Sequence, residues 1–434
     1  MEIAQIYEFF VEVGRVSTDT RQINGPCLFF ALKGGNFDGN RYAKSALEKG
    51  ATYAIVDDKS LANEPSCIYV KDALECLQSL ATYHRKQFHI PILAITGSNG
   101  KTTTKELVST ILGSHYKTHY TKGNLNNHIG VPLTLLQIPD GVDIVVVEMG
   151  ANHQGEIAAL CEIAAPTHGL ITNIGKAHLE GFGGIEGVKK GKSELYQYLT
   201  KHGGVAFINR DEKFLENLGN EVQKKLFYKE SDTPTASEPD YEVKRLQESP
   251  FLKLGFLAED GILLEVNSNL IGTYNFNNIL TAVAVGKYFK VPTQRIKSAI
   301  EGYIPTNNRS QLINFKGHKV ILDAYNANPT SMKAALTNFS NNSFQPSMVI
   351  IGDMLELGEE SYAEHLAIAS FAKAQAFTYL IAVGKEFETV SKKLGITHFH
   401  DVQSLKSWFN EQDFPQNNML LKASRGIGLE RLLK

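Results

Sequence analysis

Apolar runs of strand length alternate with stretches of helical periodicity along most of this chain. Runs of this kind that show no polar alternation are typical of parallel strands covered on both faces. The pattern therefore predicts an α/β protein whose central part is a doubly wound parallel sheet. The central runs are ILAIT from residue 92, IVVVE from residue 144, HGLI from residue 168 and VAFIN from residue 205.

The same alternation predicts three domains. Residues 1–88 combine short apolar runs with one helical stretch and predict a small α/β domain. Residues 89–308 hold the central sheet, with a more polar, strand-rich section near 212–270. Residues 309–434 repeat strand and helix four times and predict a Rossmann-like domain. A length of 434 residues agrees with two to four domains, because domains usually contain roughly 100 to 200 residues.

Composition excludes several classes of protein. The 44 basic and 46 acidic residues leave a net charge of -2, which provides no bulk attraction for nucleic acid or an anionic membrane. The first residues, MEIAQIYEFF, lack the features of a signal peptide, and no run approaches the roughly 20 apolar residues of a membrane span. We expect a cytoplasmic protein without membrane insertion. Its four cysteines form no CxxC pair and are expected to act as small hydrophobic residues.

A glycine-rich turn joins the strand run at residue 92 to a helical stretch in which Leu107, Ile111 and Leu112 share one face. A lysine, backbone N–H groups and a helix N-terminus can together surround a polyphosphate in this context. The turn lacks the first glycine of the general GxxxxGK[ST] pattern, whose place is taken by Ile95. The predicted phosphate loop consists of Gly97, Ser98, Asn99, Gly100, Lys101, Thr102 and Thr103.

Two polar residues follow neighbouring strand runs at the same predicted edge of the sheet. Glu148 ends its run and offers a hard oxygen for a magnesium ion beside the loop. His178 lies just beyond the run that starts at residue 168. From the residues alone, a turn role for Glu148 and a structural role for His178 remain open.

The motif TGSNGKTTT resembles the signature of the Mur ligases and folylpolyglutamate synthetases, and GNLNNHIGVPLTLL and GANHQGEI are similar to further motifs of this superfamily. The resemblance extends from VSTDTR near residue 16 to LLKASRG near residue 421. It implies an ATP-dependent ligase that uses ATP and two Mg²⁺ ions. The implied metal-binding residues are Thr102, Glu148, His178 and a carbamylated Lys192, with Lys189 and Lys190 as alternatives for the carbamate.

The resemblance also implies the remaining site residues. Lys101 and Arg309 are expected to act in catalysis together with the metal-binding residues Glu148, His178 and Lys192. Nucleotide contacts beyond the loop are expected at Asn275, Asn278, Arg309 and Asp323. Substrate contacts are expected at Thr18, Thr20 and Asn36 for a uridine nucleotide, and at Asn126, Asn127, Asn326 and Asn328.

Two runs in the third domain, DAYNANPTSMKAAL and VIIGDMLELGEES, resemble the branch of the family that joins D-alanyl-D-alanine to UDP-N-acetylmuramoyl-tripeptide. The DNPR-type motif of the sister branch is absent from the sequence. We therefore expect these two small-molecule substrates, a monomer, and no nucleic-acid partner. A folylpolyglutamate synthetase and a nucleotide-dependent switch or motor are the alternatives. The third peptide residue, diaminopimelate or lysine, stays open.

Overall fold

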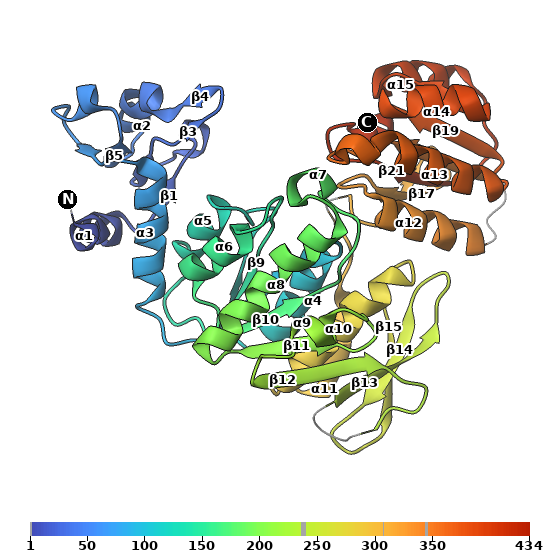
Figure 1. Ribbon diagram of the computed structural model, residues 1–434, viewed down its shortest axis with the longest axis horizontal. Helices are drawn as coiled ribbons and strands as arrows, with labels where there is room; N and C mark the ends of the chain where they lie inside the picture. The colour runs from blue at the N-terminus through green and yellow to red at the C-terminus, as the bar shows by residue number, and fades with distance from the viewer. Residues whose placement is uncertain (1, 236–239, 307, 343–345) are drawn as a thin grey trace.

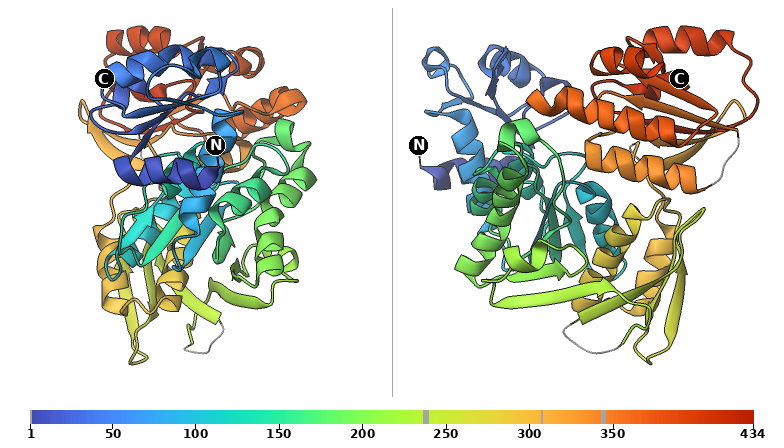
Figure 2. Two further views of the ribbon diagram at one scale, coloured as in Figure 1. Left: turned by 90° about the vertical axis from the view of Figure 1, so that its left-hand side faces the viewer. Right: turned by 45° about the vertical axis from the view of Figure 1, so that its right-hand side comes forward.

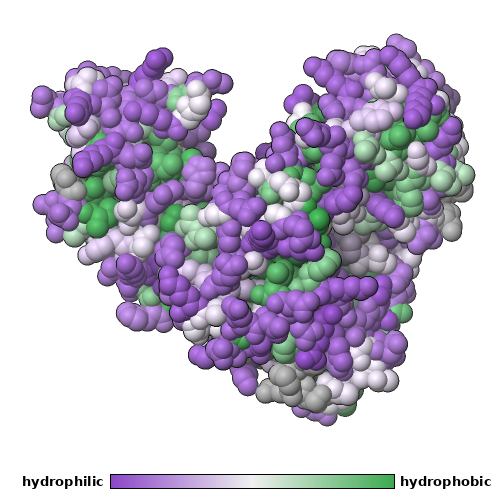
Figure 3. Space-filling view, in the orientation of Figure 1, coloured by the Kyte–Doolittle hydropathy of each residue, from purple (hydrophilic) through white to green (hydrophobic). Residues whose placement is uncertain are grey.

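The computed structural model describes residues 2–235, 240–306, 308–342 and 346–434. The amino-terminal and carboxyl-terminal parts of the chain stand as two arms on the same side of the central part (Figures 1 and 2). The space-filling view shows an open hollow between these arms (Figure 3). Within the described ranges, no helix combines the length and apolar character needed to cross a membrane.

The amino-terminal part is built on a parallel sheet in the order β1-β2-β5-β6. The strands β2 and β5 are almost wholly buried because helices pack on both of their faces. Asp72 caps the N-terminus of helix α3, because its carboxylate accepts a hydrogen bond from the Glu75 N–H. The elements are α1 (Ile3–Val13), β1 (Val16–Ser17), η1 (Thr20–Gln22), β2 (Leu28–Phe30), β3 (Lys33–Gly34), β4 (Phe37–Asp38), η2 (Gly39–Tyr42), α2 (Ala43–Glu48), β5 (Tyr53–Val56), η3 (Lys59–Leu61), β6 (Cys67–Tyr69) and α3 (Ala73–Arg85).

The central part contains a nine-stranded sheet in the order β15-β14-β13-β12-β11-β10-β7-β9-β8. Strands β7 to β13 pair in parallel with one another. Strands β14 and β15 extend the edge next to β13 and are antiparallel to their neighbours. The strands are β7 (Ile92–Thr96), β8 (Thr118–Tyr120), β9 (Ile144–Glu148), β10 (His168–Ile171), β11 (Val205–Asn209), β12 (Lys224–Glu230), β13 (Asp240–Gln247), β14 (Lys253–Leu257) and β15 (Leu263–Asn267).

Side chains of β7 divide between two hydrophobic cores. Ile92 and Ala94 pack into one core, whereas Leu93 and Ile95 pack into the core on the opposite face. Alternate strand positions point to opposite faces, so both faces are covered and the expectation of a doubly wound sheet is confirmed. The covering helices are α4 (Lys101–Gly113), α5 (Gly130–Leu135), α6 (Glu156–Ala164), α7 (Leu179–Phe182), α8 (Ile185–His202), α9 (Leu215–Leu218), α10 (Tyr274–Tyr288) and α11 (Thr293–Gly302).

The carboxyl-terminal part has a six-stranded sheet in the order β16-β17-β21-β18-β19-β20, in which only β16 runs antiparallel. The four expected strands are β17, β18, β19 and β21, and two short edge strands add to them. The elements are β16 (Gln311–Phe315), β17 (His318–Asp323), α12 (Pro329–Asn341), β18 (Ser347–Gly352), η4 (Gly358–Glu360), α13 (Ser361–Ala374), β19 (Tyr379–Val383), α14 (Glu386–Leu394), β20 (Thr397–Phe399), α15 (Val402–Glu411), β21 (Asn418–Lys422) and η5 (Leu429–Leu433).

Candidate active site

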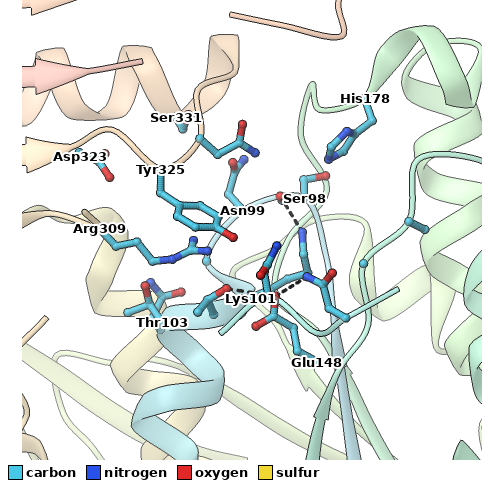
Figure 4. A pocket seen from close by; sticks show the side chains of 18 of the residues that line it. Ser98, Asn99, Lys101, Thr103, Glu148, His178, Arg309, Asp323, Tyr325 and Ser331 are labelled. Atoms are coloured by element: carbon cyan, nitrogen blue, oxygen red, sulfur yellow. Dashed lines mark hydrogen bonds between the residues drawn. The ribbon is translucent and has the colours of Figure 1, made fainter. Parts of the chain in front are cut away.

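A pocket of about 410 Å³ lies at the carboxyl ends of the central strands, where the carboxyl-terminal part meets the central part (Figure 4). It collects residues that the sequence had placed in separate motifs. The predicted site residues that line it are Ser98, Asn99, Gly100, Lys101, Thr102, Thr103, Asn126, Asn127, Glu148, His178, Asn275, Asn278, Arg309, Asp323 and Asn326.

The glycine-rich loop between β7 and α4 is fixed by the segment that follows β10. Ser98 N–H donates to the Asn173 carbonyl at 3.0 Å, and Asn99 N–H donates to the Asn173 side chain at 3.0 Å. Gly97 has a φ of +140°, and a Cβ there would lie 2.0 Å from Oγ1 of Thr172. Only glycine fits this conformation and this approach, so the loop requires Gly97 itself.

Asn275 and Asn278, expected near the nucleotide base, also support the loop. The Asn278 amide donates to Asn275 Oδ1 at 2.9 Å, and Thr104 donates to Asn278 Oδ1 at 3.1 Å. Asn275 in turn donates to the Ile271 carbonyl at 2.7 Å, and it lies inside α10, which begins at Tyr274. Asn275 therefore does not cap this helix, and the two amides join α10 to α4.

One carboxylate oxygen of Glu148 accepts two hydrogen bonds, whereas the other accepts none from the described residues. Thr102 donates to Oε1 at 3.0 Å, and the Asn126 amide donates to the same atom at 2.8 Å. Oε2 is buried and has no hydrogen-bond partner in the described part of the chain, and Nζ of Lys105 lies 4.0 Å away. A buried carboxylate oxygen beside a hydroxyl at a phosphate loop is the kind of hard donor set that Mg²⁺ prefers.

Lys101, the loop lysine, is turned back onto its own loop. Its ammonium donates to the carbonyls of Gly97 at 2.6 Å and Ser98 at 3.2 Å. Burial lowers the pKa of Lys101 to about 8, against the opposing effect of Glu148. An anionic phosphate in the pocket would favour the charged ammonium.

Lys192 lies on α8 behind the pocket, not in its lining. Its side chain is 1% exposed, and Nζ donates to the carbonyl of Ala151, a residue that does line the pocket, at 3.2 Å. Burial, reinforced by the positive charge of Lys101, holds the pKa of Lys192 well below its usual value. Burial therefore shifts this amine toward its neutral form. The neighbouring Lys190 is exposed.

His178 lies in the pocket wall and contacts the carboxyl-terminal part. Its Nδ1 is hydrogen-bonded to the carboxylate of Glu356, and the same segment contains an ion pair of 2.5 Å between Lys176 and Glu364. Hydrogen bonding to His178 lowers the pKa of Glu356. The structure thus joins the metal-ligand candidate His178 to a residue 178 positions further along the chain.

The carboxyl-terminal part brings further charged groups to the pocket. The Arg309 guanidinium stacks over Tyr325 at 3.7 Å, and its buried Nε has no hydrogen-bond partner among the described residues. Asp323 at the end of β17 forms a 2.6 Å ion pair with Lys422, so this carboxylate is already neutralised. Arg309 is therefore a cation that the carboxyl-terminal part offers to an anion in the pocket, in addition to Lys101 of the central part.

The asparagines of the third part have different roles. Asn328 caps α12 by accepting from the Ser331 N–H, and its amide donates to Asn99 Oδ1 at 2.7 Å. It therefore bridges the phosphate loop to the carboxyl-terminal part, although it does not line the pocket. Asn326 lines the pocket, and its Oδ1 accepts from the Ala327 N–H at 2.9 Å.

The predicted uridine contacts lie elsewhere. Thr18 directly follows β1, Thr20 begins η1, and Asn36 lies in the turn between β3 and β4. None of the three lines the pocket, and all belong to the amino-terminal arm, across the hollow in Figure 3. Their assignment stays a prediction.

Sequence reasoning missed several residues that the structure brings to the site. Lys105 follows the phosphate loop in the sequence, and Tyr325, Glu356 and Lys422 lie within runs that were singled out as motifs. These residues thus lie in or next to recognised motifs, but the residues that they contact are distant in the sequence. Tyr274 and Ser331 also line the pocket.

The side chains expected to bind magnesium fit a metal ion only in part. Within the described ranges, no group of three His, Cys, Asp or Glu side chains is arranged to hold a metal ion. The oxygens that fit are the Thr102 hydroxyl and the buried, unpartnered Oε2 of Glu148. A magnesium ion held there would take its remaining ligands from phosphate oxygens and water, as Mg²⁺ usually does in proteins.

Comparison with known proteins agrees with this geometry. Three family models match: "Mur ligase family, catalytic domain" at residues 12–85, "Mur ligase middle domain" at residues 95–286, and "Mur ligase, glutamate ligase domain" at residues 308–424. UDP-N-acetylmuramoyl-tripeptide--D-alanyl-D-alanine ligase of Bacillus subtilis (strain 168) is 36% identical over 435 residues, which cover 96% of this chain and 92% of the relative.

Solved structures are similar over the same extent. A crystal structure of MurF from Acinetobacter baumannii has a TM-score of 0.84 at 30% identity and covers 97% of this chain and 92% of its own. The crystal structure of MurF ligase from Thermotoga maritima in complex with ADP has a TM-score of 0.81 at 26% identity and covers 96% of each chain. With one relative 36% identical over nearly its whole length and family models matched in all three parts, the chain belongs to the Mur ligase family.

Proposed function

We propose that this protein is an ATP-dependent ligase that joins D-alanyl-D-alanine to UDP-N-acetylmuramoyl-tripeptide during peptidoglycan synthesis. The observation that carries the proposal is the pocket in which the phosphate loop of the central part faces Arg309 of the carboxyl-terminal part. The curated relative from Bacillus subtilis, whose name states this reaction, aligns with this chain across both segments. The relative from Thermotoga maritima, which was crystallised in complex with ADP, supports the binding of an adenine nucleotide.

In this proposal the reaction has two chemical steps. A carboxylate oxygen of the tripeptide attacks the γ-phosphorus of ATP, and the bond to ADP breaks to give an acyl phosphate. The amine of D-alanyl-D-alanine then attacks the acyl carbon, inorganic phosphate leaves, and the nitrogen loses a proton. Lys101 and Arg309 stabilise the negative charge that develops in the first step, because both cations face the pocket.

Magnesium would be held by Thr102 and Glu148, and His178 and Lys192 would supply ligands for a second ion. Bound Mg²⁺ offsets the repulsion between the triphosphate and the attacking carboxylate. The amine of Lys192 attacks CO₂ and loses a proton, which gives a carbamate oxygen ligand in place of a repelling ammonium. Its burial and lowered pKa support this role because only the neutral amine reacts.

The remaining assignments follow from the same proposal. Thr18, Thr20 and Asn36 contact the uridine nucleotide, Asn275 and Asn278 lie near the adenine, and the peptide end extends toward Asn126 and Asn326. The enzyme works as a monomer in the cytoplasm. The domains extend over residues 1–88, 89–308 and 309–434.

Phosphate release from ATP tests the reaction. UDP-N-acetylmuramoyl-tripeptide and D-alanyl-D-alanine should together give steady release and a product heavier by the dipeptide. Thr102→Val should abolish turnover, while Thr102→Ser, which keeps the hydroxyl, should retain it. Release that does not depend on the dipeptide, or equal use of a single D-amino acid, would refute the assignment.

The carbamate needs its own experiment. Lys192→Ala should lose activity by more than about 100-fold, as expected for the loss of a metal ligand, while the matched variant Lys190→Ala should keep it because Lys190 is exposed. Removal of CO₂ and bicarbonate should slow the unmodified enzyme. Full activity of Lys192→Ala, or activity indifferent to bicarbonate, would show that the assignment is wrong.

A further inference from the structure

The segment after β18 forms a turn that its neighbours hold rigidly. Met354 N–H donates to Nε2 of the buried His365 at 3.0 Å, and Leu355 N–H donates to the Ser424 hydroxyl at 3.1 Å. The Asp353 carboxylate accepts from the N–H groups of two residues at the start of α14, at 3.1 Å each. Three separate elements therefore fix the backbone on the amino-terminal side of Glu356.

This turn presents Glu356 directly to His178. Glu356 has a φ of +64° and His178 has a φ of +53°, so both non-glycine residues adopt the left-handed conformation. Such conformations cost about 1 to 3 kcal/mol each and persist where the surrounding structure imposes them. The carboxylate of Glu356 is hydrogen-bonded to Nδ1 of His178, so two strained positions from different parts of the chain meet at one contact.

The contact determines which ring nitrogen faces the pocket. With Nδ1 occupied by Glu356, Nε2 is the nitrogen left for a ligand, and the ring extends into the pocket on the side of Ser98 (Figure 4). A histidine that binds a metal commonly donates its other N–H to a carboxylate, which fixes the tautomer and the ring orientation.

We propose that Glu356 is a positioning residue for the ligase, supplied by the carboxyl-terminal part to orient His178 toward the phosphates and magnesium in the pocket. This inference rests on the proposed function. It makes the contact between the two parts of the chain a component of the site: His178 is correctly oriented only when the turn at Glu356 is docked.

A second contact between the same parts provides a matched control. Glu364 on α13 pairs with Lys176, two positions before His178, at 2.5 Å. This pair joins the same two segments but does not touch the imidazole. Glu364→Gln therefore weakens docking alone, whereas Glu356→Ala removes both a docking contact and the partner of Nδ1.

The test compares these variants in two measurements. Glu356→Ala should raise the Mg²⁺ concentration for half-maximal activity by about 10- to 100-fold. In calorimetric titrations it should weaken binding of a magnesium-loaded, non-hydrolysable ATP analogue by a similar factor, with unchanged binding of the metal-free analogue. Glu356→Gln should recover most of the loss because its amide oxygen still accepts the Nδ1 hydrogen. Glu364→Gln should change both quantities by less than about threefold, as for an exposed ion pair.

A double variant separates orientation from folding. In the background His178→Ala, Glu356→Ala should cause no further loss, because its effect acts through the imidazole. An equal loss in Glu364→Gln, or additive effects of Glu356→Ala and His178→Ala, would overturn the proposal. Wild-type protein that binds the loaded analogue but does not form the dipeptide product would instead refute the proposed function, so the two failures are distinguishable.

Discussion

Lys105 provides the sharpest test of how the site is held together. It is a lysine only 1% exposed, whose Nζ donates to the Thr121 carbonyl at 3.0 Å and lies 4.0 Å from Oε2 of Glu148. Glu148 is equally buried, and that oxygen accepts no hydrogen bond from any residue that the structure describes. Burial lowers the pKa of Lys105, with the charge of Glu148 acting in the opposite direction. Lys105, which also lies 3.8 Å from Oε1 of Glu106, is thus a buried cation that helps to compensate the buried carboxylate of Glu148.

The substitution Lys105→Met keeps most of the side-chain volume and removes the charge. Two unit charges 4 Å apart interact by about 4 kcal/mol at an effective dielectric constant of 20, and loss of one partner of a buried pair costs about 3 to 5 kcal/mol. For a region of about 200 residues, each kcal/mol lowers the transition temperature by about 2 to 4 °C. The central part should therefore unfold about 6 to 20 °C earlier in scanning calorimetry without nucleotide.

Two comparisons make this result interpretable. Glu148→Gln in the Lys105→Met background should restore part of the loss, because it removes the uncompensated charge. Lys190→Met, at an exposed position, should change stability by less than about 0.5 kcal/mol. A Lys105→Met protein as stable as the parent, or a double variant less stable than the single variant, would refute the role of Lys105 as the compensating cation.

Two further predictions concern the loop and the sheet. Gly97→Ala should weaken ADP binding by at least tenfold in calorimetric titration, because the new Cβ would lie 2.0 Å from Oγ1 of Thr172. Gly113→Ala should leave ADP binding unchanged, because its Cβ would have no atom within 4 Å. His168 has a pKa lowered by burial to about 4, so its contribution to stability is present above about pH 6.5 and declines as the pH falls toward 4. Urea unfolding should show that this group lowers the free energy of unfolding by about 2 kcal/mol at pH 5 relative to pH 7. The variant His168→Gln should lack this difference. Equal pH dependence in the two proteins would contradict the reasoning.

The sequence predicted the elements of the fold well because their signals are local. The apolar runs at β7, β9, β10 and β11 became buried strands, and the phosphate loop appeared between β7 and α4 as expected. The edge strand β20 was missed, since its three residues, Thr397–Phe399, are too short and too polar to stand out. The order of the strands could not be predicted either, because β21 lies between β17 and β18 in the sheet.

The site residues also divide into those that local sequence patterns predict and those whose partners are known only from the folded structure. Residues of the loop and the strand ends could be named because a strand end, a glycine-rich turn and a family motif are visible within a few positions. The pairing of Asp323 with Lys422, 99 residues later, could not be named. Neither could the bond between Asn99 and Asn328, which are 229 residues apart.

The sequence by itself determined an α/β chain of three parts, a phosphate loop and a set of acidic, basic and amide residues suited to ATP and magnesium. Tertiary structure alone decided that Lys105 compensates Glu148, that Lys192 is buried behind the pocket, and that His178 meets Glu356. Backbone propensity and side-chain chemistry act over a few residues and can be read along the chain. Burial, charge pairing and the contact between separate parts depend on packing between segments that become neighbours only in the folded protein.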